Sequence, residues 1–456
     1  MKTQKKLINA HMLSVIWLLA WPTMLEQLMQ TAVQYIDTAM VGSLGTEATA
    51  AIGSTTTINW LVNSSIAALG IGFLAFISQY LGAGEKEKAK RASAQSVLAV
   101  LVIGILFTIL CTTLNGIIPK WMQVNETIRP IASRYFLILY MPMLFRTAST
   151  IFGMVLRAAG DTKTPMKISV GVNIINVVGN FLMIYPSRTF TMWGIDIFLP
   201  GADLGVIGAA IASAFAFMIG GIWIFIVLWR HKEISPKGYR IAPDLEILKP
   251  CMRVALPNML QRFATSFGYV AFASMVNSLG SIPTAAHTIA NTVESFFYIP
   301  GYGMQTAAAT LAGNAFGAGD KDRMKELGRM FLPLEILLML ISGGALFGVA
   351  PWLVDIFSDS PEVIRLGSTV LRMVALTEPF YGVSIIVEGM MQGVGKTRLP
   401  FIFNIIGMWG IRIVGTFICT HFFKGGLIYA WGCMIAHNML LFVMFLICYL
   451  KGELQK

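Results

Sequence analysis

Charged side chains are scarce in this sequence. Of its 456 residues, 12% are Asp, Glu, Lys or Arg and 56% are hydrophobic, whereas a soluble globular domain carries about 25% charged residues. The mean hydropathy is +0.69. So few charges cannot solvate a water-soluble domain of this length. The composition therefore excludes a soluble globular protein and predicts a chain surrounded mostly by lipid.

Cysteines are few, and catalytic motifs are lacking. The five cysteines are scattered without a CxxC pair, so we interpret them as apolar filling residues. The sequence contains no HExxH or GxSxG motif and no loop that groups His with Asp, which argues against an enzyme. The segments GAGEKEK and GAGDKDR have too few glycines in the right order to cradle a phosphate, and we expect them to be charged cytoplasmic turns.

Long apolar runs dominate instead. A spanning helix needs about 20 mostly apolar residues, and twelve such segments can be drawn. No small-residue cleavage site follows the first run, so a retained span is expected. Without a periodic β pattern, the runs predict an all-α integral membrane protein with 12 transmembrane helices. The segments cover about residues 10–38, 48–80, 94–119, 131–156, 166–186, 205–229, 252–279, 285–315, 330–355, 366–392, 400–422 and 427–450.

The basic residues are distributed unequally between alternate loops. The net charge is +11, and about 24 of the 34 Lys and Arg residues lie in loops that would share one side of the membrane, against about 7 on the other. The three basic residues that are assigned to neither side, because they lie well inside spans, are Arg146, Arg262 and Arg412. The positive-inside rule then predicts a multi-pass protein of the cell membrane with both termini in the cytoplasm. The positive charge is a topology signal, so no nucleic-acid partner is expected.

The second half of the chain repeats the first at an offset of about 235 residues. PTMLEQ…MVGSLG at 22–45 matches PNMLQR…MVNSLG at 257–280, LGAGEKEK matches FGAGDKDR, and AAGDTKTP matches GVGKTRLP. Six helices per half give both halves the same orientation, which is a parallel repeat. We therefore expect two pseudo-symmetric six-helix lobes, 1–230 and 251–456, joined by a cytoplasmic linker at 231–250. Transporters built from such repeats place their sites near the midplane, between the halves.

A polar stripe follows the first expected helix. A carboxylate at the centre of a span costs roughly 2.5–3.5 kcal/mol on insertion scales, so an acid here needs a reason. Helical spacing places four polar side chains on one face. They are Glu26, Gln30, Gln34 and Asp37.

A second stripe, on the fifth expected helix, carries amides. Ser169, Asn173, Asn176 and Asn180 share one face at helical spacing. A carboxylate facing amide and hydroxyl oxygens suits a Na⁺ site, and it equally suits a carboxyl that gains and loses a proton. Alternatively, the amides only bond helices to one another.

The second half places its charges differently. At the offset of 235, Asp37 becomes Phe272, and the acidic residues lie on other helices. We expect the first lobe to hold the coupling cation, and the second lobe to supply the substrate path or a second proton site. The candidates for that second role, with Glu26 and Gln30, are Arg262, His287, Asn291, Glu294, Tyr298, Glu378, Tyr381 and Glu388.

Simpler interpretations of the second-half residues stay open. His287 and Glu388 could lie near helix ends and contact water. Arg262 is expected to pair with a carboxylate such as Glu294 or Glu378 and to serve structure.

Several segments together resemble the multidrug and toxic compound extrusion (MATE) transporters. They are IDTAMVGSLG in the first helix, SQYLGAG after the second, LRAAGDTKTP after the fourth, and the degenerate copies in the second half. The resemblance implies a monomeric antiporter of two six-helix lobes that exports small organic, often cationic, compounds in exchange for H⁺ or Na⁺, with no other cofactor. Asp37 matches the family's coupling carboxylate and Asn176 matches the fifth-helix Asn of the same site. A Na⁺ at Asp37, Asn176 and Asn180 is one form of that site.

The sequence also departs from parts of the family. Asn180 stands where some members have Asp, and Thr265 and Tyr381 stand where some have acids. The second-lobe Na⁺ site of that branch therefore lacks its carboxylates here. A rival function is that of a lipid-linked glycan flippase of the same superfamily. Such proteins often have extra helices and a strongly cationic cavity, whereas the interior of this chain has more carboxylates than arginines.

Overall fold

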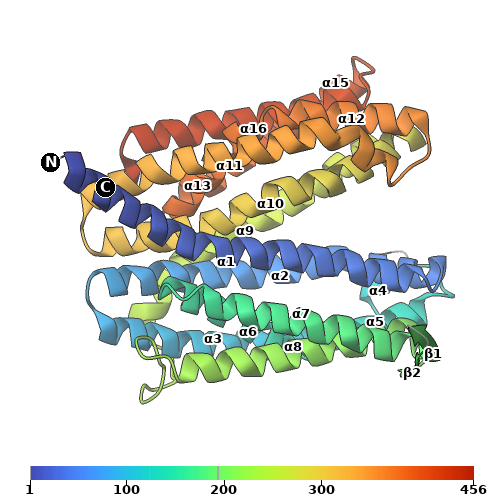
Figure 1. The fold of residues 1–456 in the computed structure, drawn as a ribbon, viewed down its shortest axis with the longest axis horizontal. Coiled ribbons are helices and arrows are strands. Elements are labelled where there is room, and N and C mark those ends of the chain that lie inside the picture. Colours follow the sequence, from blue (N-terminus) through green and yellow to red (C-terminus); the bar gives the residue numbers. More distant parts are fainter. Residues whose placement is uncertain (1, 123, 193–194, 456) are drawn as a thin grey trace. The chain divides into compact units, whose positions relative to one another are not determined.

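The computed structural model describes residues 2–122, 124–192 and 195–455, and they are almost entirely helical (Figure 1). The α-helices are α1 Lys2–Gly42, α2 Thr46–Gly82, α3 Lys86–Thr113, α4 Ile118–Trp121, α5 Arg129–Tyr140, α6 Met143–Ala158, α7 Lys163–Ile184, α8 Gly205–Trp229, α9 Leu245–Asn277, α10 Ser281–Gly317, α11 Lys321–Asp355, α12 Pro361–Ala375, α13 Glu378–Gly393, α14 Arg398–Ile405, α15 Val414–His421 and α16 Leu427–Leu450. A π-helical segment, η1 Ile406–Ile413, joins α14 to α15, and a 3₁₀ turn, η2 Glu453–Gln455, follows α16.

Twelve spans can be traced through these helices. Eight helices are long and apolar enough to cross a membrane, counting α14, η1 and α15 as one. Two further spans are bent pairs: α5 with α6 at 49°, and α12 with α13 at 54°. Helices α9 and α10, with 33 and 37 residues, are also long enough to span but are not among the helices that qualify on apolar composition. The twelve expected helices are confirmed.

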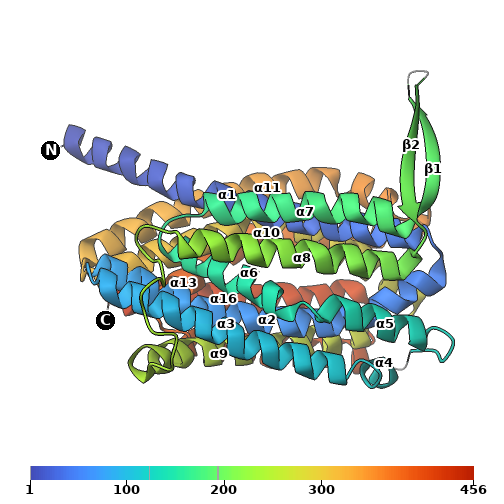
Figure 2. The ribbon, with the colours of Figure 1, turned by 90° about the horizontal axis from the view of Figure 1, so that it is seen from below.

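One element outside the spans was not predicted. Strands β1 Pro186–Met192 and β2 Ile195–Ala202 pair antiparallel between α7 and α8, with Thr189 opposite Phe198. Figure 2 shows this hairpin extending away from the ends of those two helices. The protein is therefore all-helical within the spans but not in this loop.

The described chain divides into two compact units. The C-terminal unit contains Met1–Leu28, Leu74–Glu85 and Pro250–Lys456, and the N-terminal unit contains Met29–Phe73 and Lys86–Lys249. Helices α1 and α2 therefore each contribute to both units. The units coincide with the halves of the sequence except for the start of α1 and the end of α2.

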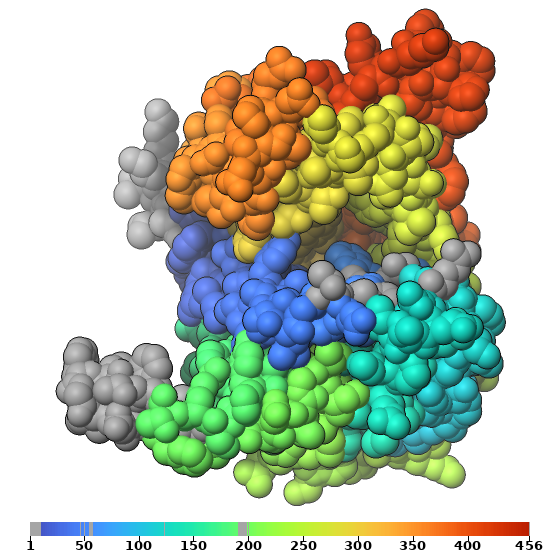
Figure 3. Space-filling model, turned by 90° about the vertical axis from the view of Figure 1, so that its right-hand side faces the viewer, coloured from blue at the N-terminus to red at the C-terminus, as the bar shows by residue number. Residues whose placement is uncertain are grey.

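The C-terminal unit is built around α10. Helix α10 contacts α11, α12 and α13, and α13 contacts α16. Side chains from these helices and from the first half of α1, such as Ile16, Phe331 and Phe445, are fully buried together. In Figure 3 the end of α9 and the start of α10 (yellow) lie beside the end of α11 and the start of α12 (orange).

Two glycines related by the repeat let α2 and α10 approach closely within the C-terminal unit. A Cβ at Gly82 would overlap the carbonyl oxygen of Asn314, and a Cβ at Gly317 would overlap that of Gln79. The two contacts are equivalent, because each residue in one has its counterpart 235 positions away in the other. The Gln79 amide also donates to the Gly393 carbonyl over 2.8 Å.

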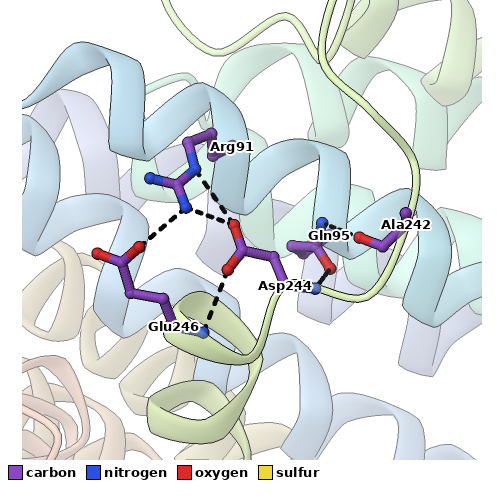
Figure 4. A network of polar contacts seen from close by, with 5 residues as sticks. All are labelled: Arg91, Gln95, Ala242, Asp244 and Glu246. Carbon is purple, nitrogen blue, oxygen red and sulfur yellow. Dashed lines mark hydrogen bonds and ion pairs between the residues drawn. The ribbon is translucent and has the colours of Figure 1, made fainter.

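The segment that follows α8 is attached to α3 inside the N-terminal unit (Figure 4). Arg91 binds the carboxylates of Asp244 at 2.6 Å and Glu246 at 2.9 Å. The Gln95 amide donates to the Ala242 carbonyl over 2.8 Å and accepts from the Asp244 backbone N–H over 3.1 Å. The residues expected to form a linker are therefore fixed to the first half of the chain up to Lys249.

Candidate functional site

The N-terminal unit brings the acid of the first helix to an amide of the fifth span. Asp37 lies near the end of α1, and the Asn180 side chain on α7 donates a hydrogen bond to its Oδ1 over 2.6 Å. Asn180 is 1% exposed and Asp37 is half-buried. Helical periodicity places each residue on the polar face of its own helix. The two polar stripes predicted from the sequence therefore meet at this hydrogen bond.

Further polar groups of α7 and α8 extend the site. Asn180 also donates to the Asn176 Oδ1 over 3.4 Å, and Asn176 donates to the Ser213 hydroxyl over 2.9 Å. The Asn173 amide nitrogen is buried and has no hydrogen-bond partner among the described residues. Ser213 of α8 was not predicted as a member.

The N-terminal unit also contains two buried polar side chains, Tyr135 and Arg146, that are linked electrostatically to Asp37 or to each other. Tyr135 on α5 interacts electrostatically with both Asp37 and Arg146. The Arg146 guanidinium lies 4.8 Å from the centre of the Phe217 ring and 6.0 Å from that of Tyr140. Its stacking on aromatic faces supports a buried cation. The site therefore combines one carboxylate, three amides and a nearby fixed positive charge.

The remaining residues of the first stripe are divided. Gln34 is exposed. Gln30 is also exposed, and its amide donates to the Ser169 hydroxyl over 3.4 Å. Glu26 is 7% exposed and belongs to the C-terminal unit, whereas Asp37 belongs to the N-terminal unit. The four residues share a helix face but not one compact unit.

The chemistry available at Asp37 is that of a carboxyl with amide neighbours. The Asn180 Oδ1 is buried and accepts no hydrogen bond within the described chain. In the described ranges, no group of three or more His, Cys, Asp or Glu side chains could hold a metal ion. A site of one carboxylate with amide oxygens is of a different kind. Such a donor set suits Na⁺ or a transferable proton.

A second polar group, in the C-terminal unit, surrounds Arg412. This residue lies in η1, and its guanidinium is 4.2 Å from the centre of the Phe272 ring and 4.8 Å from that of Tyr269. Arg412 interacts electrostatically with the buried Glu294 of α10. π-helical segments often occur at functional sites, because the wider turn redirects a side chain.

His287 belongs to the same group. Its Nδ1 accepts a hydrogen bond from the Trp431 indole over 3.2 Å, and its ring lies 5.5 Å from that of Phe272. His287 is therefore held inside the unit instead of extending into water. Asn291, one turn farther along α10, is exposed.

A cluster of tyrosines joins α10 to α13. The hydroxyls of Tyr302 and Tyr381 are 3.0 Å apart. The Tyr298 ring lies 5.8 Å from the ring of Tyr302 and 6.5 Å from that of Tyr381, in edge-on geometry. Tyr298 and Tyr381 were predicted site residues, and the structure brings them together. Glu378, at the start of α13, is 2% exposed and interacts electrostatically with Glu294.

The prediction that Arg262 pairs with Glu294 or Glu378 was wrong. Arg262 interacts electrostatically with Glu388, and its Nε donates to the Asn258 Oδ1 over 2.9 Å. The Glu388 carboxylate also accepts from the Gln261 amide over 2.8 Å. Glu378 precedes Glu388 by ten residues on α13, about 15 Å at 1.5 Å per residue, so the interaction with Arg262 is specific to one end of this pair of acids. Glu388 therefore has partners inside the protein.

Two titratable residues of the C-terminal unit were missed. Glu335 on α11 is 0% exposed and His437 on α16 is 5% exposed. Glu335 stands in RMFLPLEILLML, an acid within an apolar run, which is the signal that identified Asp37. His437 stands in an equally apolar run, MIAHNMLL. A systematic search for polar residues inside spans would have found both.

Comparison with curated proteins identifies relatives along almost the whole chain. A probable multidrug resistance protein NorM of Thermotoga maritima is 26% identical over 438 residues, which cover 96% of this chain and 92% of the relative. A probable multidrug resistance protein YoeA of Bacillus subtilis is 25% identical, covering 90% and 87%. The multidrug resistance protein MdtK of Yersinia pseudotuberculosis is 22% identical, covering 89% and 86%.

Solved structures with the same fold include membrane transporters. A MOP superfamily transporter from Pyrococcus furiosus superposes with a TM-score of 0.88 at 22% identity and covers 97% of both chains. A multidrug resistance MATE family transporter in an outward-facing conformation superposes with a TM-score of 0.85 at 22% identity, covering 96% of this chain and 94% of the other. At these identities the likeness shows the fold.

A sequence model of the MatE family matches the chain twice. The matches cover residues 22–182 and 257–418, and their first residues are 235 apart. The repeat read from the sequence is thus the unit that the family model describes. Together the two matches cover more than half of the chain. The chain therefore belongs to the MatE family of membrane transporters.

Proposed function

We propose that this protein is a cation-coupled antiporter that exports organic, often cationic, compounds by alternating access, with Asp37 as the coupling carboxyl. The observation that carries the proposal is the hydrogen bond from the Asn180 amide to the Asp37 carboxylate inside a span. Relatives along the chain that are named multidrug resistance proteins support the substrate class.

Coupling requires that Asp37 distinguish two conformations. A ligand shifts a conformational equilibrium only by the difference between its affinities for the two states. Asp37 lies on α1, which contributes residues to both compact units. A change in charge at Asp37 is therefore placed on an element shared by the two units. The cation-bound and the free forms of the Asp37 carboxyl favour opposite conformations of the transporter.

The geometry of the amide bears on the choice between H⁺ and Na⁺. Asn180 presents its Nδ2 to Asp37, whereas its Oδ1 has no described hydrogen-bond partner. A Na⁺ beside Asp37 is bound by oxygen atoms, so the Asn180 amide would have to turn over to become a ligand. A proton on the carboxyl requires no such rotation. We favour H⁺ and keep Na⁺ as the alternative.

Transport into proteoliposomes tests the proposal. Purified protein is reconstituted, a pH gradient and a Na⁺ gradient are imposed separately, and uptake of tetraphenylphosphonium or ethidium is followed. Wild type should accumulate the cation under one of the two gradients, and Asp37→Asn should not. Glu126→Gln serves as the matched control, because the Glu126 side chain is 87% exposed.

Two results would contradict the proposal. Normal uptake by Asp37→Asn would show that the coupling site lies elsewhere. Discharge of neither gradient with any organic cation, together with movement of a labelled lipid across the bilayer, would favour the flippase.

A further inference from the structure

Glu335 is a carboxylate without a partner in the interior of the C-terminal unit. It lies near the middle of α11 and is 0% exposed. Neither carboxylate oxygen has a hydrogen-bond partner within the described part of the chain. Buried polar groups are nearly always hydrogen-bonded, so an orphaned carboxylate requires an explanation.

Two glycines make room for this side chain. A Cβ at Gly301 of α10 would lie 2.6 Å from the Glu335 Oε1, and a Cβ at Gly382 of α13 would lie 3.3 Å from it. Any side chain at Gly301 would therefore displace the carboxyl. The Glu335 carboxyl thus points toward the place where α10, α11 and α13 meet.

Two other buried acids share this region. Glu378 of α13 interacts electrostatically with both Glu335 and Glu294, and its Oε2 also lacks a hydrogen-bond partner among the described residues. Tyr298 interacts electrostatically with Glu294 and Glu378, and Tyr302 and Tyr381 lie beside it. The other titratable side chains of α10 and α13 have partners elsewhere: His287 bonds to Trp431 and Glu388 to Gln261. Carboxyls that interact electrostatically in a dry interior are not all ionised together, because like charges repel there.

The three acids differ in their access to positive charge. Glu294 interacts with Arg412, whereas no cation among the described residues pairs with Glu335. On α12, which packs on α11, Arg365 and Arg372 are exposed, and Arg372 lies over Phe347, twelve residues along α11 from Glu335. Near η2, Lys396 lies 3.8 Å from Glu453. Arg412 therefore supplies positive charge to Glu294 and leaves Glu335 without a counter-charge.

An isolated ionised carboxylate in a dry interior is so costly that the group instead takes up a proton. We infer that Glu335, Glu378 and Glu294 form a proton-carrying site of the C-terminal unit, in which Glu335 holds a proton while the unit is dry and releases it when water enters. This inference deepens the proposed function, on which it rests, by adding a second proton to the exchange.

The backbone of α10 beside Glu335 lacks one helical hydrogen-bond donor. Pro300 precedes Gly301 in α10, and proline removes one backbone hydrogen bond of the helix. The Ser342 hydroxyl of α11 donates to the Phe297 carbonyl over 2.6 Å at this point. A side-chain bond thus contacts α10 one turn before Gly301, and such a bond can be exchanged for water.

Infrared difference spectroscopy on the purified full-length protein tests the inference without any substrate. The carbonyl stretch of a protonated carboxylic acid is separate from that of the carboxylate, so stepping the pH from acid to alkaline reports each buried acid that releases a proton. Wild type should lose a protonated-carboxyl band, and that band should be smaller in Glu335→Gln and in Glu335→Met. Asp355→Asn, at the exposed end of the same helix, is the control and should keep the full band.

The Met variant separates proton binding from packing, because Met fills similar volume without a titratable group. Circular dichroism and thermal unfolding establish that each variant is folded. Equal bands in wild type and in a folded Gln or Met variant would overturn the inference. So would a Glu335 band that persists over the whole pH range, since a proton that never leaves cannot be exchanged. The test measures only the part of the band that is lost in the Glu335 variants, which keep Asp37, and it requires no transport. This inference and the proposed function can therefore fail separately.

Discussion

Asp37 is held by a side chain from another helix, and that contact can be removed without touching the carboxyl itself. A hydrogen bond to a charged group is worth about 1.5–3 kcal/mol, and 1.4 kcal/mol corresponds to a factor of about ten. Asn180→Ala should therefore lower gradient-driven transport of an organic cation by about tenfold. Initial rates in proteoliposomes measure the effect, and Asn277→Ala, an exposed position at the end of α9, should transport normally. Equal rates for the two variants would mean that the amide does not support the carboxyl.

Arg412 offers a second test at the residue scale, because its charge interacts with Glu294 while its planar guanidinium stacks on aromatic rings. Lysine keeps the charge but loses the planar group that stacks on Phe272 and Tyr269. Methionine also leaves Glu294 without its cation, and breaking a buried pair in this way costs about 3–5 kcal/mol. The apparent melting temperature in detergent should fall from wild type to Arg412→Lys and further to Arg412→Met. The reverse order of the two variants would contradict this role.

Single residues could be predicted where periodicity alone decides their position. The stripes ending in Asp37 and Asn180 follow from the helical repeat, and the two residues do meet. The partner of Arg262 could not be found in this way, because it depends on how far α9 is shifted along α13. Glu335 was visible as an acid in an apolar run.

At the scale of elements, the crossing of α2 and α10 depends on glycine. Gly82→Val or Gly317→Val would place side-chain carbons where the opposite backbone lies, and overpacking of this kind costs about 1–3 kcal/mol or more. Each variant should give less folded protein and a lower melting temperature by size-exclusion chromatography and thermal unfolding. Gly344→Val makes the same chemical change on α11, where nothing lies within 4 Å, and should be tolerated much better. If all three variants behaved alike, the loss would reflect helix propensity and not the crossing.

The attachment of the 242–246 segment to α3 should be weaker than that crossing. The Arg91 side chain is 37% exposed, and exposed ion pairs are worth about 0.2–1 kcal/mol each. Arg91→Ala should therefore increase amide hydrogen exchange of this segment while transport continues. Lys325→Ala removes an exposed ion pair on α11 and should leave exchange of the segment unchanged. Unaltered hydrogen exchange in Arg91→Ala would show that the Gln95 hydrogen bonds alone hold the 242–246 segment on α3.

Two elements escaped prediction for physical reasons. The β1–β2 hairpin is a short loop element whose alternation is too brief to stand out among apolar spans. The π-helical segment η1 has the composition of an ordinary span, and only its hydrogen bonds reveal the wider turn. The helices of the spans could be predicted from the length of each apolar run, because the thickness of the bilayer sets that length.

At the scale of the molecule, the duplication was readable because one offset serves several motifs. The two matches to the family model begin 235 residues apart, as the self-comparison predicted. The division into compact units was less readable: the start of α1 and the end of α2 pack with the second half. These contacts join segments more than 200 residues apart, and no local pattern encodes them.

Coupling between two binding sites is reciprocal, and this gives the most direct test of the central claim. Proteoliposomes are loaded with tetraphenylphosphonium at equal pH and equal Na⁺ on both sides, and the internal pH and internal Na⁺ are recorded as the substrate leaves through the protein. Wild type should move H⁺, or Na⁺ if that is the coupling ion, into the liposomes against its own gradient, and Asp37→Asn should move neither. Substrate exit without any cation movement in wild type, or unchanged cation movement in Asp37→Asn, would contradict the account.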